Sequence, residues 1–210
     1  MAQITSPLGF FEGRIGTVTF YRDAQGRNLC RSLSHHRKGS HPQQKAWEKR
    51  FTTVIHSLPC LMKAIQTGFP GNKGLYKGFR GFVRANIQQA VIQNEVCPQG
   101  KLNFERLQLS AGEVTPPCLK GEWTAASRVA AFSHKGCPLE SYHALADDQI
   151  YAVAVDESLS FCQLMLLGQR AQDFHLEMQV KDAPFSSRIH LYVFATTADG
   201  QQASATVRLL

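Results

Sequence analysis

The sequence lacks the features from which membrane insertion or secretion is usually predicted. No stretch of about 18 consecutive apolar residues occurs in the 210-residue chain, so we expect no membrane span. The first nine residues, Met1 to Gly9, contain neither a basic start nor a long apolar run, so we expect no secretory signal. Both absences favour a cytoplasmic protein or one that is associated with a larger particle.

Closely spaced cysteines and known catalytic motifs are also absent. The six cysteines include no C-x-x-C pair, which a zinc site usually needs, and we expect reduced, mostly buried thiols. No G-x-S-x-G, H-E-x-x-H or phosphate-loop motif occurs. The acidic pairs Asp147-Asp148 and Asp156-Glu157 lie beside predicted strands, where we expect exposed turns. The sequence therefore predicts a protein that is no enzyme and has no cofactor, metal or small-molecule substrate.

Charge is distributed unequally along the chain. Residues 1–106 carry 16 Lys and Arg against 5 Asp and Glu, whereas residues 107–210 carry 7 against 11. A basic half of this kind favours an acidic partner, which could be nucleic acid, an acidic protein surface or the acidic half of a neighbouring copy.

The start of the basic half is predicted to form a Gly-rich arm and a β-hairpin. Residues 17–21 and 28–33 alternate between apolar and polar side chains, and Asp23 and Gly26 between them are turn formers. The arm, residues 9–16, is interrupted by glycines and carries the apolar side chains of Phe10, Phe11 and Ile15. Such a short segment cannot bury these side chains by itself. We therefore expect it to contact another chain or, alternatively, to pack on its own module.

Helices are predicted to follow the hairpin. Pro42 suits the first turn of a helix whose apolar positions repeat every three or four residues as far as Leu58. We expect Pro59 to kink or end this helix and a short second helix to reach Gly68. A third helix is predicted over roughly residues 75–92. The aromatic side chains on the apolar faces of these helices are expected in the core, namely Trp47, Phe51, Phe79 and Phe82.

The acidic half is predicted to be a chain of antiparallel strands. Turn residues separate seven segments of alternating pattern, namely 102–109, 122–131, 149–155, 161–167, 174–180, 188–195 and 203–209. This number of strands fits a two-sheet sandwich similar to immunoglobulin or fibronectin type III domains. Trp123 is then the expected core tryptophan, and Tyr192 the expected tyrosine near the sandwich corner.

The fold class predicted from these patterns is α+β, with two modules. Residues 1–100 form a basic hairpin-helical module and residues 101–210 an acidic β-sandwich module. The boundary is expected within residues 93–103, which are rich in turn formers.

Several short motifs are spread along the chain, and together they resemble a known family. They are Gly13-Arg14-Ile15-Gly16-Thr17-Val18, Arg31-Ser32, His41-Pro42-Gln43-Gln44 with Phe51, Phe82-Val83-Arg84-Ala85-Asn86, Leu109-Ser110-Ala111-Gly112, His190-Leu191-Tyr192-Val193-Phe194 and Asp199-Gly200. This set resembles an uncharacterised family from Bacteroidetes, a domain of unknown function. The chain departs from the family pattern at His41, where a helix-capping Thr is usual, and at Glu48, where Arg is usual. The N-terminal pattern is also similar to small accessory proteins of phages and prophages, which implies a virion or assembly role.

The function predicted from the sequence is therefore structural. We expect a non-enzymatic assembly protein that self-associates or decorates a larger particle, located in the cytoplasm or on a virion. The alternative is nucleic-acid binding by the basic N-terminal half. The candidate interaction residues are Phe10, Phe11, Ile15, Arg31, Arg37, Lys38, Lys45, Lys49, Arg50, Lys77, Arg80 and Arg84.

Overall fold

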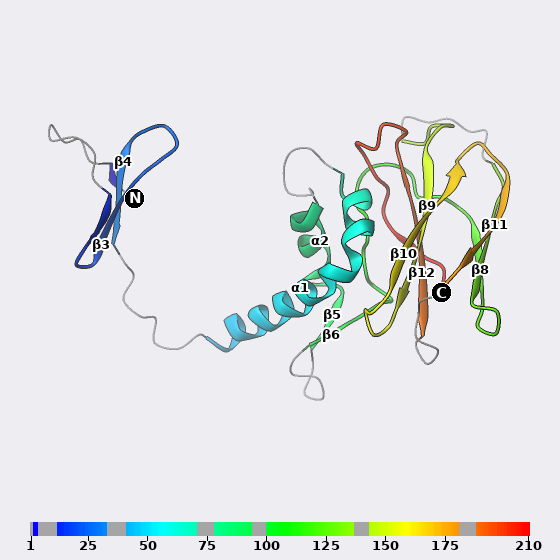
Figure 1. Ribbon diagram of the computed structural model, residues 1–210, viewed down its shortest axis with the longest axis horizontal. Coiled ribbons are helices and arrows are strands. Elements are labelled where there is room, and N and C mark those ends of the chain that lie inside the picture. The colour runs from blue at the N-terminus through cyan, green and yellow to red at the C-terminus, as the bar shows by residue number, and fades with distance from the viewer. Residues whose placement is uncertain are drawn as a thin grey trace. The chain divides into compact units, whose positions relative to one another are not determined.

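The computed structural model describes residues 2–3, 12–32, 41–70, 78–93, 100–136, 143–180 and 188–210 (Figure 1). Helices and antiparallel sheets occur together in these residues and strands predominate, which confirms the α+β class. The chain divides into two compact units, Met1–Lys45 and Ala46–Leu210. This division differs from the predicted boundary within residues 93–103, because the helices and the later strands share one hydrophobic core.

The first unit is built on a small antiparallel sheet. Its strands are β1 (Ala2–Gln3), β2 (Gly13–Ile15), β3 (Val18–Arg22) and β4 (Asn28–Ser32), in the order β1-β4-β3-β2. Strands β3 and β4 form the predicted hairpin, with Phe20 opposite Cys30. The carboxylate of Asp23 closes the turn, because its Oδ1 atom accepts hydrogen bonds from the backbone N–H groups of Gln25 and Arg27 at 3.0 and 2.8 Å.

The long helix α1 (Pro42–Gly68) begins where the sequence predicts. Pro42 occupies its first position, where a backbone N–H would have no partner within the helix. The Nδ1 atom of His41 accepts a hydrogen bond from the backbone N–H of Gln43 at 3.3 Å. His41 therefore caps the helix by the same kind of contact that a Thr side chain would make.

Helix α1 continues through Pro59, so the prediction of a separate second helix is wrong. Proline cannot donate the hydrogen bond to the carbonyl four residues earlier, which normally weakens a helix. Pro59 is exposed here, whereas Leu58 and Leu61 on either side of it are buried in the core. Tertiary packing of the apolar face therefore maintains the helix across the proline.

Helix α2 (Gly78–Asn86) is shorter than the predicted helix over residues 75–92. Val91 lies instead in strand β5 (Val91–Ile92), which pairs with β6 (Lys101–Leu102). The helix ends at Asn86, whose Nδ2 atom donates to the carbonyls of Phe82 and Gln108, each at 2.8 Å. Its Oδ1 atom accepts from the N–H of Gln108 at 2.8 Å. One buried amide thus joins the end of α2 to a segment about 20 residues later.

Two antiparallel sheets complete the second unit. Their strands are β7 (Lys120–Thr124), β8 (Val129–His134), β9 (Gln149–Asp156), β10 (Cys162–Gln169), β11 (Phe174–Gln179), β12 (Ile189–Thr196) and β13 (Val207–Arg208). The first sheet has the order β10-β9-β12-β13 and the second the order β11-β8-β7. The predicted strand over residues 122–131 is in fact a hairpin, and Arg128 in its turn has φ 56°. The predicted strand over 102–109 is reduced to β6.

The second unit has three layers, with the four-stranded sheet in the middle (Figure 1). Alternate residues of β12, such as Leu191 and Val193, pack with Phe132 of β8 between the two sheets. The intervening residues, Tyr192 and Phe194, pack with α1 and α2 on the other face. All residues of β12 are consequently buried.

Two close backbone approaches hold the loops against this core. A Cβ atom on Gly68 would lie 2.1 Å from the carbonyl oxygen of Leu109, and one on Gly112 would lie 2.2 Å from that of Ala203. The Thr206 hydroxyl oxygen also accepts hydrogen bonds from the N–H groups of Leu109 and Ser110, each at 2.8 Å. Glycine is required at both positions for space rather than for its conformational freedom.

None of the described helices has the length and hydropathy needed to cross a membrane.

Replacing Asn86 by Ala should lower the free energy of unfolding by about 2–4 kcal/mol, because it leaves buried backbone groups of Gln108 without partners. Thermal or urea unfolding measures the difference. Gln88→Ala, at an exposed position after the same helix, is the matched control and should change stability by less than about 0.5 kcal/mol. Equal effects of the two substitutions would contradict the role assigned to Asn86.

Candidate functional site

The sheet of the first unit has two chemically different faces. Residues that pair across antiparallel strands lie on the same face, so Ile15, Val18, Phe20 and Cys30 share one face. We call this the apolar face. Ile15 is 73% exposed, and none of residues 12–32 reaches full burial.

The opposite face of this sheet is basic. Arg14, Thr19 and Arg31 form one row across β2, β3 and β4. The guanidinium of Arg31 lies 5.8 Å from the centre of the Tyr21 ring, within the range of a cation–π contact. We call this the basic face. Of the predicted interaction residues, Ile15 and Arg31 therefore lie on opposite faces of one sheet.

The other described candidates lie on the two helices. Lys45, Lys49 and Arg50 are on α1, and Arg80 and Arg84 are one turn apart on α2. Arg50 donates from Nε to the side-chain oxygen of Gln93 at 3.4 Å, and its guanidinium lies 5.9 Å from the Trp47 ring. The remaining candidates, Phe10, Phe11, Arg37, Lys38 and Lys77, lie outside the described residues.

Three aromatic side chains that we expected in the core are exposed. Phe82 is fully buried as expected, but Trp47, Phe51 and Phe79 are 44%, 46% and 45% exposed. Trp47 and Phe51 are one turn apart at the start of α1, so they lie on the same side of the helix. Helical spacing identified an apolar stripe correctly, but it cannot tell how much of the stripe meets the core.

The expectation that both acidic pairs lie in exposed turns is also wrong, because one member of each pair is buried. Asp148 is 1% exposed and its Oδ2 atom lies 3.0 Å from Nε of the buried Arg170. The Nη2 atom of Arg170 donates to the carbonyl of Thr115 at 2.6 Å. These contacts join three loops. They explain why an aspartate and an arginine can be buried here, because each charge is neutralised by the other.

Asp156 is the buried member of the second pair and organises the turn between β9 and β10. Its carboxylate accepts hydrogen bonds from the hydroxyls of Ser158 and Ser160 and, at 2.7 Å, from the N–H of Phe161. Burial raises the pKa of Asp156, but these hydrogen bonds from Ser158, Phe161 and Ser160 outweigh it and hold the pKa below its ordinary value.

The cysteines agree only partly with the expectation of buried thiols. Cys30, Cys60 and Cys162 are free and partly buried, Cys118 is free and exposed, and Cys97 and Cys137 lie outside the described residues. A hydrogen bond with Cys162 lowers the pKa of the Cys60 thiol, while the same contact and burial raise the pKa of Cys162. In the part of the chain that the structure describes, no three metal-ligating side chains cluster to hold an ion.

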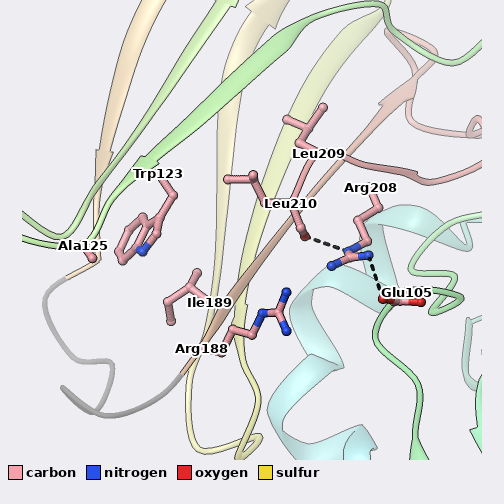
Figure 2. Close-up of a pocket in the computed structure, with 8 residues that line it drawn as sticks. All are labelled: Glu105, Trp123, Ala125, Arg188, Ile189, Arg208, Leu209 and Leu210. Carbon is pink, nitrogen blue, oxygen red and sulfur yellow. Dashed lines mark hydrogen bonds and ion pairs between the residues drawn. The ribbon is translucent and has the colours of Figure 1, made fainter.

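A cavity of about 820 Å³ lies at one end of the sandwich (Figure 2). Trp123 of β7, Ile189 of β12 and Leu209 form its apolar side, and the outer atoms of Leu210 also reach it. On the other side are the guanidinium groups of Arg188 and Arg208 and the carboxylate of Glu105, as Figure 2 shows. We call this cavity the sandwich-end pocket.

Arg208 is held in the pocket by its own chain. Its Nε atom donates to the backbone oxygen of Leu210 at 2.7 Å, and its Nη1 atom lies 3.8 Å from the Glu105 carboxylate (Figure 2). The backbone carbonyl of Arg188 accepts a hydrogen bond from the N–H of Glu157 at 2.9 Å, but its guanidinium makes no hydrogen bond or ion pair with any described residue. Sequence reasoning missed this pocket, because Trp123, Arg188 and Arg208 lie in three segments whose proximity depends on the sheet order.

Comparison with models of protein families found no match for this chain, and comparisons with curated proteins and with solved structures found none either. The resemblance of its motifs to the Bacteroidetes family and to phage accessory proteins therefore stays a prediction.

The buried carboxylate of Asp156 should make stability depend on pH in the acidic range. Because its pKa is lower in the folded protein than in the unfolded chain, its contribution is fully present above about pH 4 and is lost as the pH falls through the folded value. Asp156→Asn should reduce the free energy of unfolding by about 1–3 kcal/mol at pH 7. The difference from wild type should narrow below about pH 4.

Urea unfolding at a series of pH values tests this dependence. Asp147→Asn removes the same charge from an exposed position and should stay within about 0.5 kcal/mol of wild type throughout. A pH-independent effect of Asp156→Asn would show that the charge of this side chain is unimportant.

Proposed function

We propose that the protein is a non-enzymatic assembly protein that self-associates through the apolar face of its N-terminal sheet. One observation carries the proposal: this sheet has a face of apolar side chains and no fully buried residue among residues 12–32. A β-sheet is stable when its apolar face is covered by a second layer. For Ile15, at 73% exposure, that cover is missing within the described part of one chain.

A second copy of the chain is the occupant that fits this face. Ile15 and Val18 lie at neighbouring positions on it, and its charged residue, Arg22, is at the end of β3. Two such faces can therefore pack on each other around a two-fold axis without burying like charges at the centre. The basic face cannot pair with itself in this way, because its row brings Arg14 and Arg31 together. Self-association through the apolar face therefore leaves the basic face exposed, where it could contact an acidic partner.

The fold of the second unit supports a structural role. Its sheet orders, β11-β8-β7 and β10-β9-β12-β13, are compatible with the fibronectin type III-like sandwich expected from the sequence. Two details differ from that expectation. The Tyr192 hydroxyl donates to the carbonyl of Phe104 at 2.7 Å on the helical side of the sheet, and Trp123 lies on the edge strand β7. A sandwich of this kind commonly presents loops or edges to other proteins, and decoration of a phage particle belongs to this proposal.

Ile15→Asp should weaken self-association by about a hundredfold or more. Each copy then places a carboxylate in an apolar contact, and a two-fold interface contains the change twice. Sedimentation equilibrium or light scattering after size exclusion measures the mass over a concentration series. Thr17→Asp, at the exposed turn between β2 and β3, is the matched control and should leave the assembly unchanged.

The salt dependence identifies the surface in contact. Association through the apolar face should persist at high salt, whereas a head-to-tail contact between basic and acidic halves should weaken. Deleting residues 1–12 removes β1 from the sheet and should abolish association while the second unit stays folded. A wild-type protein that is monomeric at high concentration in both low and high salt would refute the proposal.

Nucleic-acid binding is the second candidate function, and the arrangement of the basic face favours it. Arg14 and Arg31 lie in one row beside Tyr21, so two guanidinium groups and an aromatic ring face the same side. The rings of Trp47 and Phe79, which we expected in the core, are exposed and so are available for stacking on bases.

Binding of labelled single-stranded DNA or RNA should weaken steeply as salt rises if this candidate is correct. The double variant Arg14→Ser, Arg31→Ser should reduce the slope of log affinity against log salt by about 1.4, since each phosphate contact on a single strand contributes about 0.7. Arg22→Ser, on the apolar side of the same sheet, is the control and should change the slope less. Absence of binding at low salt would exclude this function.

A further inference from the structure

The sandwich-end pocket combines an apolar wall with a basic one. Trp123, Ile189 and Leu209 all pack on the core between the two sheets, so their positions are fixed by that core. The atoms of these side chains that remain outside the core form the apolar wall of the cavity. At about 820 Å³ the cavity has the size of a small-molecule site, and its few polar groups are of one main kind.

The positions of Arg188 beside β12 and of Arg208 in β13 place their side chains on the basic wall of the pocket. Arg188 comes directly before Ile189, and Arg208 is opposite Tyr192 in the pairing of β12 with β13. Figure 2 shows the Arg188 side chain extending toward the side of the pocket where Arg208 and Glu105 lie, with Trp123 on the far side. Arg208 already has the Leu210 oxygen and Glu105 as neighbours, whereas the guanidinium of Arg188 has no acceptor among the described residues. A planar guanidinium in this position matches a carboxylate in geometry and charge.

A buried histidine lies behind this wall. His190 is 4% exposed, and it stacks on Phe104 with the ring centres 4.5 Å apart. Both of its ring nitrogens lack a hydrogen-bond partner among the described residues. Burial, Arg208 and Arg188 lower the pKa of His190, while Glu157 and Glu105 act in the opposite direction with less effect. The pKa of this imidazole therefore depends on the charge of the basic wall.

We propose that the sandwich-end pocket binds a monoanionic carboxylate that carries a branched aliphatic or aromatic group. The carboxylate pairs with Arg188 at the basic wall, and the apolar group packs on Trp123 and Ile189. Glu105 beside Arg208 disfavours a dianion such as phosphate, because it adds a negative charge 3.8 Å from one of the two guanidinium groups. This chemistry is shared by free carboxylic acids and by the C-terminal residue of a peptide.

Fluorescence of Trp123 provides a direct test, because the chain has two tryptophans and Trp47→Phe leaves Trp123 alone. In the full-length Trp47→Phe protein, the probes are N-acetyl-leucine, N-acetyl-phenylalanine, an acetylated peptide that ends in Leu with a free carboxylate, and inorganic phosphate. The amides of the first two probes are the matched uncharged ligands. We expect a saturable change with the carboxylates and little change with the amides or with phosphate. Tighter binding of the peptide than of N-acetyl-leucine assigns the site to a chain terminus, and equal binding assigns it to free acids.

Variants in the same background locate the binding. Arg188→Gln should weaken carboxylate binding by about tenfold to a hundredfold, and Arg188→Lys should weaken it less. Arg106→Gln removes the same charge from an exposed position outside the pocket and should leave affinity unchanged. NMR titration of His190 gives an independent readout, because a bound anion offsets the two arginines and should raise the pKa of this imidazole.

Three results would overturn the proposal. The first is the absence of a saturable signal up to about 10 mM carboxylate, the weakest binding of interest. The second is an equal response to the acid and to its amide. The third is an affinity that Arg188→Gln leaves unchanged. Melting curves of each variant show that the fold is intact, since Arg188 is exposed and contributes no contact to the core.

Discussion

The second unit depends on the burial of both faces of β9 and β12, the two inner strands of its middle sheet. Strands β9 and β12 contribute alternate side chains to two separate cores, one shared with the second sheet and one shared with the helices. Strands in this position have no solvent-facing side that could tolerate a polar substitution. Two of their buried polar groups have their own partners: the Tyr192 hydroxyl donates to a backbone carbonyl, and the Asp156 carboxylate accepts from its own turn. The imidazole of His190 has no such partner among the described residues. Both the loops and the helices take their positions from these two strands.

Local patterns predicted most of the elements but not their extent. The hairpin of the first unit and the start of α1 follow from alternation, turn residues and Pro42, because all of these act within a few residues. The helix was predicted to kink or end at Pro59, but packing of the apolar face outweighs the missing hydrogen bond. The third helix was predicted to include Val91, but the chain leaves the helix after Asn86 and Val91 pairs with Leu102 in a short sheet. The nearly continuous apolar run in β12 contained a signal for a third layer, since a half-exposed strand would alternate with polar residues. The prediction of two modules overlooked it.

The candidate sites were less predictable for a related reason. Asp148 is buried because Arg170, 22 residues later, neutralises it, and nothing in the local sequence indicates that partner. The sandwich-end pocket likewise requires knowledge of which strand lies beside which. By contrast, the division of the N-terminal sheet into apolar and basic faces follows directly from the hairpin register. The exception is Ile15, which the sequence placed in an arm before the hairpin and which belongs instead to a third strand, β2, paired with β3.

The hydrogen bonds between distant parts of the second unit have consequences for how the chain folds during synthesis. Asn86, Ser110 and Tyr192 each close a contact between layers, and the hydrogen bonds from Tyr192 to Phe104 and from Leu109 to Thr206 span 88 and 97 residues. Contacts of this length form slowly, because the intervening chain must first be ordered. On a ribosome, helix α1 emerges well before β12 exists, so the side of the helix that carries Leu58 and Leu61 has no sheet to cover it. During synthesis there is thus an interval in which the apolar side of the first long helix is exposed to water.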